Sequence, residues 1–167
     1  MKYTSAEAAK LLRKLNEEHD ALLALEQESR EFLAASTEDP ASVRPEYDYP
    51  AVQNELQALE TKIRRVKHCI NQFNITHQVP GFDMAVDQML VYIPQLTARR
   101  EKLRRMKGLL PKQRQEHYGS SNIIDYRYAN YDIAQAKADY DQAADTLARA
   151  QTALDLLNST QTMDIDL

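Results

Sequence analysis

Cysteine, glycine, tryptophan and long apolar runs are all scarce in this chain of 167 residues. With three glycines and no tryptophan, a glycine-loop nucleotide-binding fold or a β-rich fold is disfavoured against helix. The single cysteine, Cys69, cannot form an internal disulfide. The longest apolar run, Met89 to Ile93, is far shorter than the roughly 20 residues of a membrane span, and the first residues carry no apolar signal core. We therefore expect a cytoplasmic protein without membrane segments.

The stretch from Val52 to Phe73 organises the chain. Its apolar residues alternate between spacings of four and three, at Val52, Leu56, Leu59, Ile63, Val66, Ile70 and Phe73. Such heptads place all of these side chains on one narrow stripe of a helix, which partner helices must cover. A second run with the same spacing extends from Ile133 to Leu157.

The rest of the chain predicts two further helices and their connections. Thr4 and Glu7 form a capping-box pattern, so the first helix should begin at Thr4. A proline-rich, extended connection over residues 36–50 follows it, and Pro94 should kink or split the third helix. A short strand or an ordered extended loop is expected over residues 118–131, and residues 158–167 could form a terminal strand. The predicted helices span residues 4–35, 51–73, 82–110 and 132–158.

These elements predict an all-α fold, a single domain over residues 1–167 built as an antiparallel up-down four-helix bundle with coiled-coil-like helices. In that bundle the connections 36–50 and 118–131 meet at one end. Residues 74–79 and 159–165 meet at the other end, where they could pair as short strands. If the helices instead open out as hairpins, a second chain would bury the same seams.

The run Gln113-Arg114-Gln115-Glu116-His117-Tyr118-Gly119-Ser120-Ser121 and the step Asn74-Ile75-Thr76 resemble the septicolysin-like family of small bacterial helical proteins. The tail Asn158-Ser159-Thr160 is similar to that family's as well. The resemblance covers residues 51–165, and this chain departs from the family in its connection 36–50 and in Pro94. It implies a helical fold and self-association. It transfers no catalytic or binding residue, since the family has no established biochemical activity.

Metal binding and catalysis find no support in the residue pattern. A di-iron bundle needs an acidic residue three positions before a histidine, and none of the four histidines has one. His68 and Cys69 are adjacent, so on a helix they diverge by about 100° and do not chelate. Ser120, His117 and Asp125 lie close in sequence without an oxyanion hole or nucleophile elbow. We predict no metal, no cofactor, no small-molecule substrate and no enzymatic activity.

The net charge of -4 hides a basic centre, since residues 51–114 carry 12 Lys and Arg against 5 Asp and Glu. The candidate basic strip consists of Arg99, Arg100, Lys102, Arg104, Arg105 and Lys107. No aromatic residues interleave with it for base stacking, so pairing with the acidic first or fourth helix is the preferred interpretation. Sequence-independent nucleic-acid binding through residues 99–114 is the alternative.

Six of the nine tyrosines fall in the two connections that the bundle brings together. This candidate interaction surface consists of Tyr47, Tyr49, Tyr118, Tyr126, Tyr128 and Tyr131. Tyrosine is enriched at protein interfaces, so a subunit contact or local packing is favoured over a ligand site. We therefore predict a self-associating scaffold or protein-interaction module, a homo-oligomer without catalytic activity. A toxin-like membrane activity, suggested only by the family name, is disfavoured because no strongly apolar amphipathic segment is left over.

Overall fold

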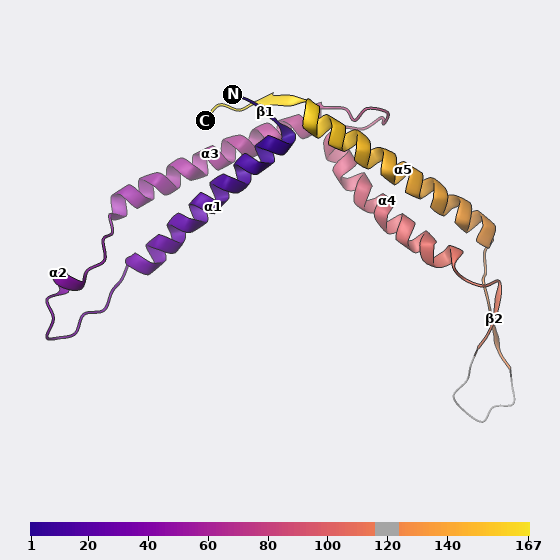
Figure 1. Ribbon diagram of the computed structural model, residues 1–167, viewed down its shortest axis with the longest axis horizontal. Helices are drawn as coiled ribbons and strands as arrows, with labels where there is room; N and C mark the ends of the chain where they lie inside the picture. The colour runs from indigo at the N-terminus through magenta and orange to yellow at the C-terminus, as the bar shows by residue number, and fades with distance from the viewer. Residues whose placement is uncertain (116–123) are drawn as a thin grey trace. The chain divides into compact units, whose positions relative to one another are not determined.

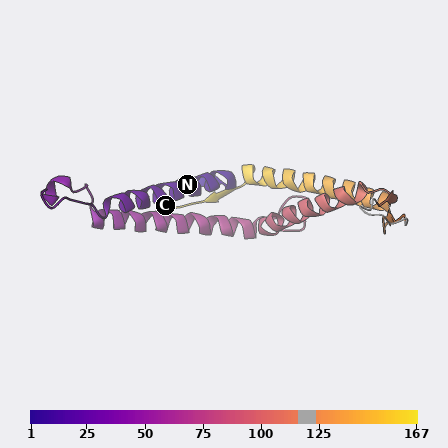
Figure 2. The same ribbon diagram turned by 90° about the horizontal axis from the view of Figure 1, so that it is seen from below.

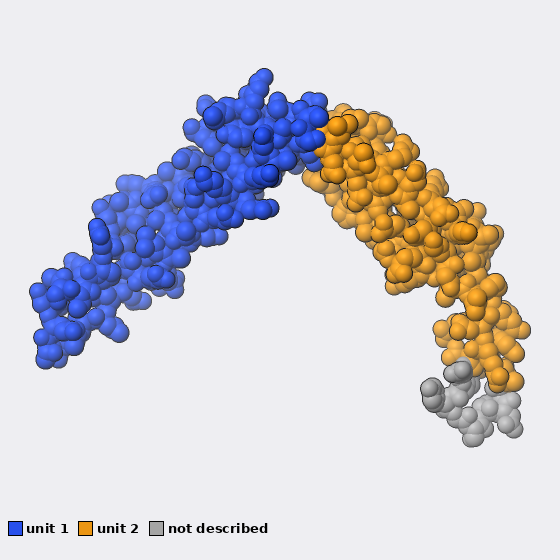
Figure 3. Space-filling model, in the orientation of Figure 1, with its two compact units in different colours: residues 1–76, 158–167 blue, residues 77–157 orange. Residues whose placement is uncertain are grey.

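The computed structural model describes residues 1–115 and 124–167 (Figure 1). They form two compact units, residues 1–76 with 158–167 (unit 1) and residues 77–157 (unit 2), as Figure 3 shows. The elements are β1 (Lys2–Thr4), α1 (Ser5–Ser29), α2 (Pro40–Val43), α3 (Tyr49–Thr76), α4 (Val86–Lys107), β2 (Lys112–Arg114), β3 (Tyr126–Tyr128), α5 (Ile133–Thr160) and β4 (Thr162–Asp164). The mostly helical character is confirmed, together with small antiparallel strand pairs. A bundle of all four long helices is not confirmed, because each unit is built on two of them.

In unit 1, α1 and α3 lie side by side (Figures 1 and 2). The Gln53 amide of α3 donates to the Glu26 carboxylate of α1, and the His19 imidazole of α1 pairs with the Glu60 carboxylate of α3. The residue numbers rise on one helix as they fall on the other, so the two helices run antiparallel. The predicted seam of α3 is confirmed: Val52, Leu56, Leu59, Val66 and Phe73 are buried, and Ile63 and Ile70 are half-buried. The seam therefore holds unit 1 together.

The predicted start of α1 is also confirmed. The Thr4 hydroxyl accepts from the Glu7 amide at 3.2 Å, and the Thr4 amide donates to the Glu7 carboxylate at 2.8 Å. This backbone hydrogen bond from Thr4 lowers the pKa of the Glu7 carboxyl. α1 ends at Ser29 and not at residue 35, because residues after Ser29 lie beyond the start of α3 and have no helix to pack on. Leu33 is accordingly 97% exposed.

The predicted C-terminal strand exists, but its expected partner is wrong. β4 pairs with β1 in antiparallel register, with Tyr3 opposite Met163, and not with residues 74–79. The reason is that α3 continues through Thr76, so residues 74–76 are helical and offer no strand edge. Met163 and Ile165 are buried, which ties this strand pair to the core of unit 1.

In unit 2, α4 and α5 lie side by side (Figures 1 and 2) and bury their heptad residues. These are Val86, Met89, Leu96 and Leu103 on α4, and Ala136, Ala143, Leu147, Ala150, Leu154 and Leu157 on α5. α4 runs unbroken past Pro94, so of the two predicted effects the split is absent and the kink stays a prediction. Pro94 is exposed, and the Leu90 carbonyl that loses its amide partner belongs to a residue 48% exposed, where water can bind that oxygen. No described helix combines the length and apolar character that a membrane span requires.

Replacement of Met89 by Ala tests the unit 2 seam. Met89 is fully buried, so we expect Met89→Ala to lower the free energy of unfolding by about 2–5 kcal/mol through lost burial and a residual cavity. Leu25→Ala is the control, because Leu25 is 51% exposed and its truncation should change stability by less than about 0.5 kcal/mol. Urea unfolding followed by circular dichroism measures the free energy of unfolding of both variants. Equal losses of stability in the two variants would contradict the role of Met89 in the unit 2 core.

Candidate functional site

The candidate basic strip lies on α4, beside the acidic helix α5. α4 carries six Lys and Arg against two Asp and Glu, whereas α5 carries two against four. The ion pairs of the strip stay within α4, since Glu101 binds Arg100 at 3.3 Å and Arg104 at 2.9 Å. Hydrogen bonds from Arg104 and then Arg100 lower the pKa of the Glu101 carboxyl. Within the described ranges no ion pair joins α4 to α5, so the preferred pairing of the strip with an acidic helix stays a prediction.

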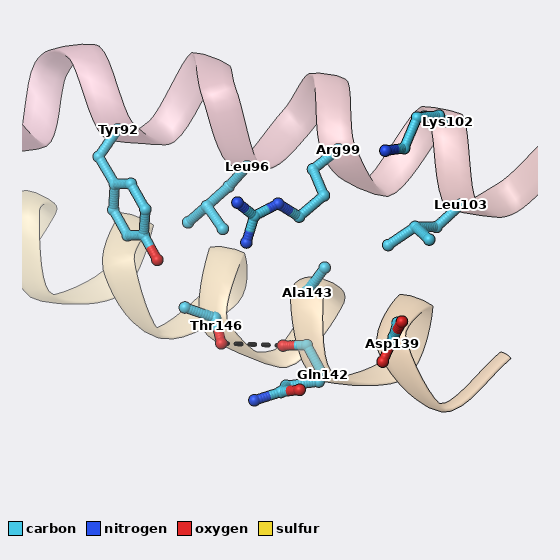
Figure 4. Close-up of a pocket in the computed structure, with 9 residues that line it drawn as sticks. All are labelled: Tyr92, Leu96, Arg99, Lys102, Leu103, Asp139, Gln142, Ala143 and Thr146. Atoms are coloured by element: carbon cyan, nitrogen blue, oxygen red, sulfur yellow. Dashed lines mark hydrogen bonds between the residues drawn. The ribbon is translucent and has the colours of Figure 1, made fainter. Parts of the chain in front are cut away.

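Two members of the strip line a groove of about 370 Å³ between α4 and α5 (Figure 4). Arg99 reaches from α4 toward α5, where Ala143 presents only a methyl group, and Lys102 lies along the rim. Asp139 of α5 brings one carboxylate to the groove. The Thr146 hydroxyl donates to the Gln142 carbonyl at 2.8 Å, so it is engaged by its own helix. The groove therefore offers two cations and one carboxylate, and no nucleophile paired with a base.

The last turn of α4 is tied to the chain around α5 by two tyrosines. The Tyr131 hydroxyl donates to the Met106 carbonyl at 2.6 Å. The Lys107 ammonium lies 3.4 Å from the centre of the Tyr140 ring, a cation–π contact. Tyr131 is thus a local packing residue that joins the end of α4 to the start of α5.

Immediately after α4, β2 and β3 form an antiparallel ribbon. Lys112 pairs with Tyr128, Gln113 with Arg127, and Arg114 with Tyr126. Backbone hydrogen bonds extend the ribbon at both ends, from Ala129 to the Pro111 carbonyl at 3.2 Å and from Gln115 to the Asp125 carbonyl at 2.9 Å. The strand around Tyr126 was expected from its alternating pattern, whereas β2 was not, because three polar residues carry no apolar alternation.

One face of this ribbon gathers cations and tyrosines. Directly paired residues of an antiparallel ladder project to the same side, and so do residues two apart on one strand. Lys112, Arg114, Tyr126 and Tyr128 therefore share one side, which we call the tyrosine face, and Gln113 and Arg127 share the other.

The side-chain positions of Lys112, Tyr126 and Tyr128 agree with this assignment. The Lys112 ammonium lies 4.0 Å from the ring centre of Tyr126 and 5.5 Å from that of Tyr128. The two ring centres are 6.5 Å apart with planes tilted by 52°. Tyr126 is 45% exposed and Tyr128 is 62% exposed, so both rings are open to solvent.

The remaining tyrosines of the candidate interaction surface lie elsewhere. Tyr47 and Tyr49 belong to unit 1, and Tyr118 lies outside the described residues. The Tyr47 hydroxyl donates to the Glu26 carboxylate at 2.7 Å, and the Gln53 amide donates to the same oxygen at 2.6 Å. The hydrogen bond to Glu26 raises the pKa of Tyr47 to about 12. Tyr47 therefore joins the 36–50 connection to α1.

Metal-ligand chemistry is not assembled in the part of the chain that the structure describes. Over residues 1–115 and 124–167, no three His, Cys, Asp or Glu side chains lie close enough to hold one ion. The basic strip and the tyrosine face follow one another along the chain, on α4 and then on the β2–β3 ribbon.

The Tyr47 hydrogen bond predicts an alkaline transition. The folded state favours the protonated phenol, so the hydrogen bond stabilises unit 1. This stabilisation is complete below pH 10, the usual pKa of tyrosine, and is lost as the pH rises through the folded-state pKa of about 12. We expect Tyr47→Phe to lower the thermal midpoint at pH 8 and to remove the phenol that ionises near pH 12 in an absorbance titration. Tyr49→Phe, at an exposed residue, is the control; an unchanged titration curve in Tyr47→Phe would contradict the assignment.

No family model and no curated protein matches this sequence, so the resemblance to septicolysin-like proteins stays a prediction. A solved structure described as a functionally unknown conserved protein from Corynebacterium diphtheriae is similar to it, with 20% sequence identity and a TM-score of 0.60. The match covers 98% of this chain and 100% of that chain. At this identity the likeness shows the fold alone, and the chain is a mostly helical protein that shares its fold with a protein of unknown function.

Proposed function

We propose that this protein is a non-catalytic, self-associating interaction module, and that two copies meet through the outer face of α4. The observation that carries the proposal is an exposed apolar patch on that helix. Leu90 is 48% exposed and Val91 is 59% exposed, and Pro94 and Ala98 are exposed beside them. At about 100° per residue these four side chains lie on the side of α4 away from its buried seam. Contiguous exposed apolar residues of this kind mark interaction sites.

Charge at the ends of the patch favours a second copy as the partner. Asp87 lies one turn before Leu90 and Arg105 two turns after Ala98, on the same outer face, and both are exposed. If the two-fold axis is perpendicular to the helices, the two α4 helices run antiparallel and Asp87 of each copy opposes Arg105 of the other. A two-fold contact needs a self-complementary surface of this kind.

The middle of the patch supports close packing. Pro94 and Ala98 are small, so two helices can approach each other more closely there than at larger side chains. The four helices of such a dimer, α4 and α5 from each copy, would form a helical assembly between chains in place of the single-chain bundle. The resemblance to septicolysin-like proteins implies self-association as well.

Light scattering over a range of protein concentrations tests the dimer. We expect a mass that rises from 19.2 kDa toward twice that value for the natural sequence, and that stays at 19.2 kDa for Val91→Glu. Leu25→Glu places the same new charge at another exposed residue of unit 1, 51% exposed, and should still dimerise. A monomer at every concentration, or equal effects of the two variants, would refute the α4 contact.

Charge exchange tests the orientation of the two helices. Asp87→Arg and Arg105→Asp should each weaken the dimer, because each places like charges opposite one another. The double variant restores opposite charges and should regain the dimer, with α4 content checked by circular dichroism. A double variant weaker than either single one would rule out the antiparallel arrangement.

A further inference from the structure

We propose that the tyrosine face of the β2–β3 ribbon binds single-stranded nucleic acid, with bases stacked on Tyr126 and Tyr128 and phosphates held by Lys112 and Arg114. This surface is separate from the α4 patch, so the inference goes beyond self-association. It rests on the juxtaposition of two open aromatic rings with two cations on one side of a ribbon.

The rings supply the stacking element. Both tyrosines belong to one strand and project to one side, with ring centres 6.5 Å apart. Their tilt of 52° leaves them unstacked on each other. With 45% and 62% of their surface exposed, each ring offers area to a base. Base–aromatic stacking tolerates every base, because each has a π face.

The cations supply the phosphate element. Residues 99–115 carry eight Lys and Arg and one Glu, so the ribbon begins where the basic strip of α4 ends. Glu101, the one acidic residue of this stretch, pairs with Arg100 and Arg104 on α4 and not with Lys112 or Arg114 of the ribbon. Contacts of this kind attract phosphates independently of sequence.

Single strands fit this face better than duplexes. In a duplex each base is covered by its neighbours, so a tyrosine ring cannot reach a base face. A single strand exposes both its base faces and its phosphates. An acidic protein would use the cations alone and would leave the two exposed rings without a role.

Fluorescence anisotropy with labelled oligo(dT) and oligo(U) of about 16 nucleotides tests the proposal, a length at the upper end of known single-strand sites. We expect Tyr126→Val and Tyr128→Val each to weaken binding by about five- to 150-fold, the change that corresponds to loss of one stacked base. Valine keeps strand propensity. Tyr126→Phe and Tyr128→Phe keep the ring and should keep the affinity. Binding of either oligonucleotide with this pattern supports the proposal.

A matched pair of charge removals tests which side of the ribbon is used. Lys112→Gln lies on the tyrosine face and Arg127→Gln on the other, within the same three-residue ladder. Loss of one phosphate contact should reduce the slope of log affinity against log salt by about 0.7 for Lys112→Gln. Arg127→Gln should leave that slope unchanged.

Three outcomes would overturn the proposal. The first is absence of oligonucleotide binding at low salt. The second is binding that is not specific to bases: the valine substitutions leave the affinity unchanged, or heparin binds as tightly as the oligonucleotide. Either result would indicate a general polyanion-binding surface. The third is a preference for duplex or for an acidic protein. Light scattering of the valine variants separates the two proposals, since their dimerisation through α4 should persist.

Discussion

Each unit depends on the burial of one narrow apolar seam between two helices. Spacings of four and three residues keep Val66 and Phe73 on the same side of α3, and Met89 and Leu96 on the same side of α4. Over residues 1–115 and 124–167, every residue that is buried as a whole is apolar. Charged residues are therefore displaced to the flanks and outer faces, where they stay available for contacts. Because each seam occupies only one narrow side of its helix, most of the helix surface remains exposed and carries charged residues.

The sequence predicts what is local and misses what depends on a distant partner. The seams of α3 and α5 and the Thr4 cap follow from spacing and from hydrogen bonds within a few residues, and all were confirmed. The end of α1 depends on where α3 begins, and the partner of β4 depends on whether residues 74–76 are helical. A heptad seam can be covered by any other helix, so periodicity alone does not specify which helices pair.

The candidate site was also predictable only in part. The sequence shows that α4 is rich in Lys and Arg and that β3 carries two tyrosines, but it does not show that the cations of β2 lie beside those tyrosines. Arg114 and Tyr126 become neighbours only through the register of the ribbon. That register is held by backbone hydrogen bonds at Pro111 and Asp125, and backbone groups are common to every residue. A sequence search for aromatics within the basic run therefore finds none, although the fold places two beside it.

The pairing of β1 with β4 makes unit 1 discontinuous along the chain, with all of unit 2 inserted between α3 and β4. Synthesis on the ribosome proceeds from the N-terminal to the C-terminal side, so α1 and α3 emerge long before residues 162–165 can add Met163 and Ile165 to their core. Unit 2 is contiguous and can complete its own seam in the meantime. The adjacency of residues 1 and 165 also places two distant points of the chain within 3.0 Å. In a circular permutant joined there and opened in the exposed 31–44 connection, α3 would be translated first and α1 last, so α1 would become the element that completes unit 1.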